Sequence, residues 1–308
     1  MTPTAPPAWK VGLIVTIGIL AVSASAIFIR LAFQISGETG FGFSLVLSAS
    51  RLTIAALLFA PAWRNVGIPG AWKRGWRFSV GAGIFLALHF ACWITSLSYT
   101  SIAASTALVT TNPVWMALLS WLWFKEKPGR QLTLGIAIAL LGSLLVGLGG
   151  AGTSGAALNP ALGNVLALVG SWAVTLYFLL GREAQRCGLD ISGHAVLTYT
   201  TAALVLLPLP LLLGSKYTGY PPLVYLCIAL IGLFPQAIGH TSLNWAVRWV
   251  SPTLVTLTIL AEPVGSSILG LLIFREDPGA IVWIGAAIIL GGVAIAALSQ
   301  RSLKQAGE

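Results

Sequence analysis

The sequence predicts an all-α membrane protein with ten transmembrane helices, built as two inverted five-helix repeats around a central cavity. Composition is the first observation behind this prediction; the apolar runs and an internal repeat are the others. Hydrophobic residues make up 57% of the 308 positions and charged residues only 8%, with a mean hydropathy of +0.91. Soluble domains carry roughly a quarter charged residues. With so few charges, most of the outer surface must face lipid.

Long apolar runs predict each of the ten helices in turn. Each run is close to the roughly 20 residues that a helix needs to cross a hydrocarbon core about 30 Å thick. A β-barrel would instead need shorter segments of alternating polarity. The runs cover residues 11–33, 41–63, 76–98, 102–124, 131–149, 160–180, 194–214, 220–245, 252–274 and 280–299.

The first run also has features of a secretory signal peptide. An apolar stretch at 11–22 precedes the small residues Ser23–Ala26, which would suit a cleavage site. However, the apolar stretch continues to Phe33, and only one lysine, Lys10, precedes it. We therefore expect a first helix that is retained in the membrane.

The distribution of positive charge predicts the orientation of the chain in the cell inner (plasma) membrane. With the N-terminus in the cytoplasm, thirteen of the seventeen Lys and Arg residues fall in cytoplasmic segments and only Lys216 and Arg275 on the other side. The remaining two, Arg30 and Arg51, lie within apolar runs. Because Lys and Arg favour the cytoplasmic side, both termini are expected inside.

An internal repeat relates the two halves at an offset of 150 or 151 residues. The ordered matches, which chance would seldom produce, are Lys125–Gly129 with Arg275–Gly279, Pro113 with Pro263, Gly135 with Gly285, Gly142 with Gly292, and His89 with His240. The predicted repeats are residues 11–149 and 160–299, with a connector at 150–159. Five helices per repeat is an odd number, so the second copy would enter the membrane from the opposite side, as in alternating-access carriers.

The repeated unit resembles one found in the drug/metabolite transporter superfamily, in its EamA-type ten-helix members. The unit is a proline, an apolar helix and Phe-(Lys/Arg)-Glu-x-Pro-Gly, at Pro113–Gly129 and Pro263–Gly279. The resemblance covers nearly the whole chain. It implies a secondary transporter of small metabolites that works by alternating access, with amino acids as the leading substrate class and export as the leading direction. A uniporter or channel for another small solute, such as an amine, a purine or a sugar derivative, is the alternative.

Glu262 is a candidate for chemistry because ionisable groups inside a bilayer are costly and usually functional. It precedes Pro263, and its repeat mate Asn112 precedes Pro113. Prolines break helices and expose backbone groups, and such breaks often line transporter binding sites. Glu262 could bind a substrate amine or carry a coupling proton, or it could join two helices by a structural hydrogen bond.

Arg51 lies in the second apolar run, where three roles remain open. Its guanidinium could bind a substrate carboxylate through paired hydrogen bonds. It could instead neutralise Glu262 as an internal ion pair, or satisfy backbone carbonyls between helices.

Other cavity candidates follow from helical spacing. His89 and Trp93 lie four residues apart, as do His240 and Asn244 in the second half, so each pair shares a helix face. Trp172, deep in its run, could stack on a substrate or fill space. Further polar candidates lie one turn from each other on the ninth run: Thr258 and Glu262.

Other functions are less well supported by the sequence. Gly152–Gly155 matches the Gly-x-Ser-Gly string of rhomboid proteases, which makes an intramembrane enzyme the remote alternative. The string falls in a Gly/Ala-rich connector, where such strings arise easily, so no catalytic residue, metal site or cofactor is expected. The net charge of +9 is a topology signal rather than a nucleic-acid site. The expected partners are a small-molecule substrate, the bilayer and a possible coupling proton; the oligomeric state stays open.

Overall fold

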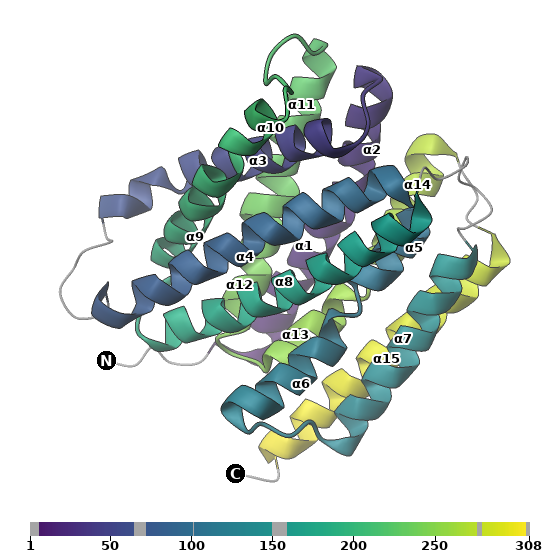
Figure 1. Ribbon diagram of the computed structural model, residues 1–308. Helices are drawn as coiled ribbons and strands as arrows, with labels where there is room; N and C mark the ends of the chain where they lie inside the picture. The colour runs from purple at the N-terminus through teal and green to yellow at the C-terminus, as the bar shows by residue number, and fades with distance from the viewer. Residues whose placement is uncertain (1–5, 65–71, 101, 150–158, 276–278, 306–308) are drawn as a thin grey trace.

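A computed structural model describes residues 6–64, 72–100, 102–149, 159–275 and 279–305. Within these ranges every regular element is a helix (Figure 1). In chain order they are α1 (Ala8–Ser23), α2 (Ser25–Ser36), α3 (Phe41–Leu58), the 3₁₀ helix η1 (Ala60–Arg64), α4 (Trp72–Tyr99), α5 (Ile102–Val109), α6 (Asn112–Phe124), α7 (Arg130–Gly149), α8 (Pro160–Arg186), α9 (Ile191–Leu206), α10 (Pro208–Leu212), α11 (Pro222–Ile231), the π-helix η3 (Gly232–His240), α12 (Thr241–Ala246), α13 (Pro252–Ile259), α14 (Glu262–Phe274) and α15 (Ala280–Gln305).

The prediction of ten apolar helices is confirmed. Several elements join end to end into one span, as α1 and α2 do over Ala8–Ser36. In the described residues nine such spans are long and apolar enough to cross a membrane, and Arg130–Val146 adds a shorter tenth. Large apolar side chains such as Leu20, Leu141 and Leu212 are exposed on the outside, where lipid would cover them.

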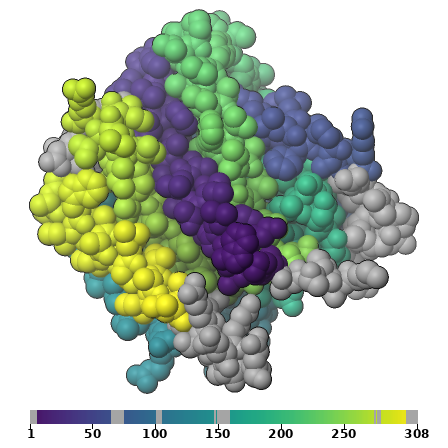
Figure 2. Space-filling view, turned by 180° about the vertical axis from the view of Figure 1, so that it is seen from behind, coloured from purple at the N-terminus to yellow at the C-terminus, as the bar shows by residue number. Residues whose placement is uncertain are grey.

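The space-filling view in Figure 2 shows how the N-terminal span fits into the bundle. The purple α1 and α2 cross that face between the yellow α14 and α15 and the green α11 and α12. Ser266 Oγ on α14 donates to the backbone oxygen of Ser23 at 2.9 Å. The small residues that resemble a cleavage site therefore lie at a packed helix crossing.

Helices α7 and α15 pack antiparallel through four glycines (Figure 1). A Cβ atom added to Gly135 would lie 2.7 Å from the Gly292 oxygen, and one added to Gly142 would lie 2.6 Å from the Gly285 oxygen. Backbones approach this closely only where side chains are absent. Gly135 thus meets Gly292, the residue 150 positions after Gly142, and Gly142 meets Gly285, the residue 150 positions after Gly135.

The two halves also match in local geometry. Helices α6 and α14 each have 13 residues, and each ends at a residue in the left-handed region, Lys125 (φ 60°) and Arg275 (φ 56°). Because α7 and α15 run antiparallel, these two turns lie at opposite ends of the bundle (Figure 1). Residues 150–158 of the expected connector lie outside the described ranges.

Candidate functional site

Two helix breaks meet near the centre of the bundle. The chain leaves α5 at Val109 and restarts at Asn112, and it leaves α13 at Ile259 and restarts at Glu262. A proline follows each restart, where its missing N–H costs nothing because the first turn of a helix has no internal acceptor for it. Asn112 and Glu262 therefore each begin a half-helix, and the positive end of the α14 dipole favours the Glu262 carboxylate.

A cavity lies at these breaks, between segments of both halves. The centres of water molecules can occupy about 40 Å³ of this cavity, which is enough for roughly three waters. A larger solute would need its walls to move apart. The lining residues are Val22, Ser25, His89, Trp93, Val109, Thr110, Asn112, Val174, Phe178, Pro235, His240, Leu243, Ile259 and Glu262.

Five of the nine residues proposed from the sequence thus line one cavity: Glu262, Asn112, His89, His240 and Trp93. The Asn112 Oδ1 and Trp93 Nε1 atoms are buried without a hydrogen-bond partner among the described residues. Glu262 is partly buried. Buried polar atoms nearly always have a partner, so unpaired ones facing a cavity indicate a place for a polar ligand or water.

The two histidines are neighbours in the cavity wall, with ring centroids 6.3 Å apart. His89 Nδ1 lies 2.9 Å from the carbonyl oxygen of Gly170. A carbonyl only accepts, so Nδ1 carries the hydrogen, and in the neutral ring Nε2 is an acceptor. Trp93 stacks on the His89 ring, with centroids 5.9 Å apart, and the Nδ1 atom of His240 has no hydrogen-bond partner within the described part of the chain.

Arg51 lies behind the cavity wall. Its side chain is fully buried, its Nη1 donates to Ser25 Oγ at 3.4 Å, and its guanidinium lies 3.7 Å from the centre of the Phe90 ring. No ion pair within 4.0 Å joins Arg51 to Glu262. Among the described residues Arg51 makes neither an ion pair with Glu262 nor a hydrogen bond to a backbone carbonyl, which are two of the three roles left open.

Asn244 does not line the cavity. It lies one helical turn beyond His240, where α8 and α9 close over it. Its Nδ2 contacts His194 Nε2 at 2.5 Å and Tyr177 Oη at 3.3 Å, and His194 Nδ1 contacts Ser79 Oγ at 2.9 Å. Asn244 was expected beside His240 in the cavity, but at its depth in the bundle the side chains of α8 and α9 surround it.

Trp172 and Thr258 also lie away from the cavity. Trp172 is 56% exposed on the outer surface, in edge-to-face contact with Trp115 at 5.2 Å. Thr258 Oγ1 donates to the carbonyl oxygen of Val255 in its own helix at 2.6 Å. A tryptophan in the middle of an apolar run can face either lipid or the protein interior. Its position in the run therefore did not predict the side of the helix on which Trp172 lies.

Comparison with known proteins identifies the architecture. The model of the EamA-like transporter family matches this chain twice, over residues 9–148 and 161–298. The chain belongs to the EamA-like transporter family. It is therefore a multi-pass membrane transporter of small solutes.

Several similar proteins are named as transporters. The uncharacterized transporter YdfC of Bacillus subtilis is 28% identical over 68% of this chain and 67% of its own length. The uncharacterized inner membrane transporter YedA of Escherichia coli is 28% identical over 64% and 62%. A probable terminal-alkyne amino-acid exporter of Streptantibioticus cattleyicolor is 24% identical over 87% of both chains. A solved crystal structure has the same fold, with a TM-score of 0.75 and 21% identity over 96% of this chain and 99% of the other.

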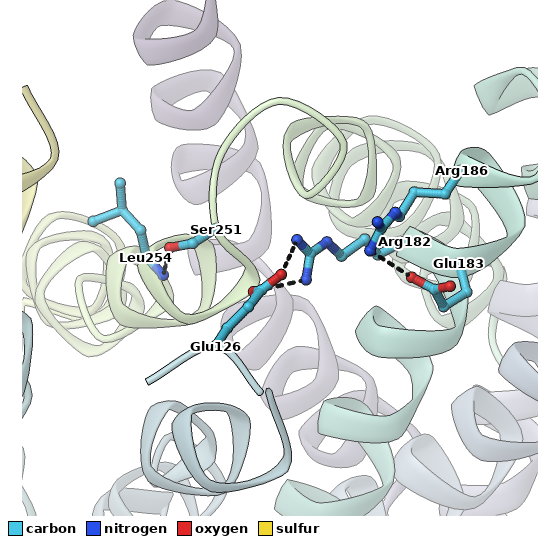
Figure 3. A network of polar contacts seen from close by, with 6 residues as sticks. All are labelled: Glu126, Arg182, Glu183, Arg186, Ser251 and Leu254. Carbon is cyan, nitrogen blue, oxygen red and sulfur yellow. Dashed lines mark hydrogen bonds and ion pairs between the residues drawn. The ribbon is translucent and has the colours of Figure 1, made fainter. Parts of the chain in front are cut away.

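An ion pair in this EamA-like transporter joins the turn between α6 and α7 to helix α8 (Figure 3). Glu126, just after α6, accepts two hydrogen bonds from Arg182 of α8, at 2.7 and 3.0 Å. The Arg182 guanidinium also lies 5.0 Å from the centre of the Phe124 ring. A second pair, Glu183 with Arg186, lies within α8 and joins no other element.

The sequence analysis missed Ser25 and Phe178 as wall residues of this transporter. Ser25 interrupts an apolar run, which was itself a signal, but it was attributed to a cleavage-like motif. Phe178 carries no such signal, because one aromatic residue in an apolar run resembles any other. The Gly152–Gly155 string lies outside the described residues.

Proposed function

We propose that this EamA-like transporter exports small aliphatic amino acids across the inner membrane by alternating access. The observation that carries the proposal is the cavity at two matching helix breaks, lined by Glu262 and Asn112 together with apolar side chains. The similar probable terminal-alkyne amino-acid exporter supports the substrate class and the direction.

The cavity wall supports a small aliphatic substrate. Its apolar members include Val22, Val109, Val174, Leu243 and Ile259. Side chains of this kind gain free energy by covering an aliphatic group from water, about 25 cal/mol per Å² of apolar surface. They cannot form hydrogen bonds with a sugar, so several of its hydroxyl groups would be buried without partners.

The polar residues of the wall have distinct proposed roles. Glu262 accepts the substrate ammonium group, with Asn112 Oδ1 beside it as a second acceptor at the equivalent break. When no substrate is bound, the Glu262 carboxylate takes a proton instead. The ammonium group and the proton therefore compete for one carboxylate, and this competition couples export to proton entry.

His89, His240 and Trp93 complete the proposed binding site. The free Nε2 of a neutral His89 ring would accept a hydrogen bond, and Trp93 Nε1 would donate one. The ring of His240 would close the site from the second half. Each half thus contributes both a helix break and an aromatic histidine.

Alternating access needs a closure at each end of the cavity. We assign the closure at the α6–α7 end to the Glu126–Arg182 pair, because it connects α6 to α8, and both helices border the cavity (Figure 3). By the count of Lys and Arg, this end faces the cytoplasm together with both termini. The pair must break for the substrate to enter from inside.

Counterflow in liposomes tests the proposal. Vesicles containing the purified protein are preloaded with unlabelled leucine, and the uptake of labelled leucine is measured. A carrier that alternates predicts faster uptake into preloaded vesicles, and Glu262→Gln should abolish leucine transport. The matched control is Ser267→Ala in the same helix, whose hydroxyl only donates to the Pro263 oxygen at 2.8 Å. Uptake that does not depend on preloading would instead indicate a channel.

A further inference from the structure

Arg51 carries hydrogen-bond donors that no residue of the described chain satisfies. Its Nε and Nη2 atoms are buried without partners, and the contact of Nη1 with Ser25, at 3.4 Å, is long. A buried guanidinium is costly unless it is paired and fully hydrogen-bonded. The energetic cost of this arrangement indicates that the guanidinium gains a partner in another state of the transport cycle.

The surroundings of Arg51 favour an anionic partner. The ring of Phe90 covers one face of the guanidinium, so the free donors lie along its edge. Gln236, on the π-helix η3 that packs against α3, is also fully buried, with both amide atoms unpaired. Among the described residues no carboxylate contacts Arg51, whose partners are Ser25 and the Phe90 ring.

The position of Ser25 connects Arg51 to the proposed binding site. Ser25 lines the same cavity as Glu262 and is also the residue that holds Arg51. A reorientation of the Arg51 or Ser25 side chain would bring the guanidinium edge to the cavity. Glu262 and Arg51 would then act on opposite ends of one small ligand.

We propose that Arg51 is the specificity-determining residue that binds the carboxylate of the substrate, so that the site selects zwitterions over simple amines. This inference rests on the proposed function, because it assumes that Glu262 binds the ammonium group of the same molecule. A carboxylate fits the two free donors, since its two oxygens accept paired hydrogen bonds from a guanidinium edge. Its charge also replaces the distant Glu262 as the counter-charge of Arg51, which leaves Glu262 to the ammonium group.

The test compares ligands that differ in one group. Alanine, norvaline and leucine are each titrated against their own carboxamides at about pH 6, where the α-amino group of both forms is charged. Binding to the purified full-length protein is measured by the rise in melting temperature with ligand concentration. The wild type should bind each amino acid about 10- to 100-fold more tightly than its carboxamide, the range for hydrogen bonds to a charged group.

Variants of Arg51 test whether this residue causes the preference for amino acids over carboxamides. Arg51→Gln should reduce the ratio of the two affinities to about one, mainly by weakening amino-acid binding, because glutamine cannot make the charged, paired contact with a carboxylate. Arg51→Lys keeps the buried charge, should fold if the glutamine variant does not, and should lose most of the preference because an ammonium group cannot make the paired contact. The control is Arg248→Gln, which removes a guanidinium placed 5.1 Å from the Trp249 ring and should keep the preference.

Two outcomes would overturn the inference, and they differ in what else they affect. Equal binding of amino acids and carboxamides by the wild type, or an equal loss of both in the Arg51 variants, would reduce Arg51 to a structural residue and leave amino-acid transport standing. No binding of any amino acid or carboxamide by the wild type would refute the proposed function and the inference with it.

Discussion

Replacing Glu126 with glutamine removes the carboxylate that holds Arg182 through hydrogen bonds of 2.7 and 3.0 Å. The substitution keeps the size of the side chain and removes its charge. If the pair closes the cavity at this end, its loss should shift the protein toward conformations that are open there.

The expected change in the ratio of closed to open molecules depends on how far water screens the ion pair. The Arg182 side chain is 16% exposed and that of Glu126 is 41% exposed, so water screens the pair in part. Exposed ion pairs contribute about 0.2–1 kcal/mol, and paired hydrogen bonds from arginine place this one at the upper end. A loss of about 1 kcal/mol changes the ratio of closed to open molecules by about fivefold.

Cysteine labelling measures this ratio. Cys92, Cys187 and Cys227 are replaced, and a single cysteine is introduced at Val109 in the cavity wall. In inside-out vesicles, a membrane-impermeant maleimide should label this cysteine about five times faster in Glu126→Gln than in the parent, because labelling requires the open state.

The matched control is Glu183→Gln, which removes the same charge from the same end of the bundle. Glu183 pairs at 3.3 Å with Arg186 three residues along its own helix, so its loss releases no other element. An equal acceleration in Glu183→Gln would mean that surface charge, and not the joining of α6 to α8, controls access. No acceleration in Glu126→Gln would remove the pair from the proposed closure.

Three further predictions concern topology, packing and coupling. Reporter fusions near Lys125 and Arg275 should report opposite sides of the membrane, and the same side for both would contradict the inverted repeat. Gly142→Ala should lower the melting temperature in detergent, since its Cβ would lie 2.6 Å from the Gly285 oxygen and overpacking costs about 1–3 kcal/mol; Gly270→Ala, with nothing within 4 Å, should not lower it. Glu262→Gln should abolish amino-acid movement driven by a pH gradient, and unchanged gradient-driven transport would show that Glu262 is not the proton carrier.

The candidate site could be predicted from sequence only in part, as its histidines illustrate. The pairing of His89 with His240 followed from the repeat offset, and the structure places both rings in one cavity. The same spacing argument placed Asn244 beside His240, yet Asn244 contacts His194 instead. Helical periodicity gives the direction in which a side chain leaves its helix, but not which neighbours fill the space at that depth.

Arg51 shows the same limit for charged residues. Its position in an apolar run marked it as functional, because a charge in lipid is costly. Its partner could not be derived, since helices α2 and α4, which supply Ser25 and Phe90, are separate in sequence from α3. The unpaired Nε and Nη2 atoms became visible only with the packed bundle.

Three features could be predicted from residue order: a surface that faces lipid, ten apolar helices and the offset between the halves. Hydrophobicity, run length and repetition need no knowledge of which residues meet in space. Tertiary structure decided that four glycines join α7 to α15, that Glu126 holds Arg182, and that Trp172 faces outward. These depend on how each helix is rotated and how deep it lies against its neighbours, which is settled by contacts between residues distant in the sequence.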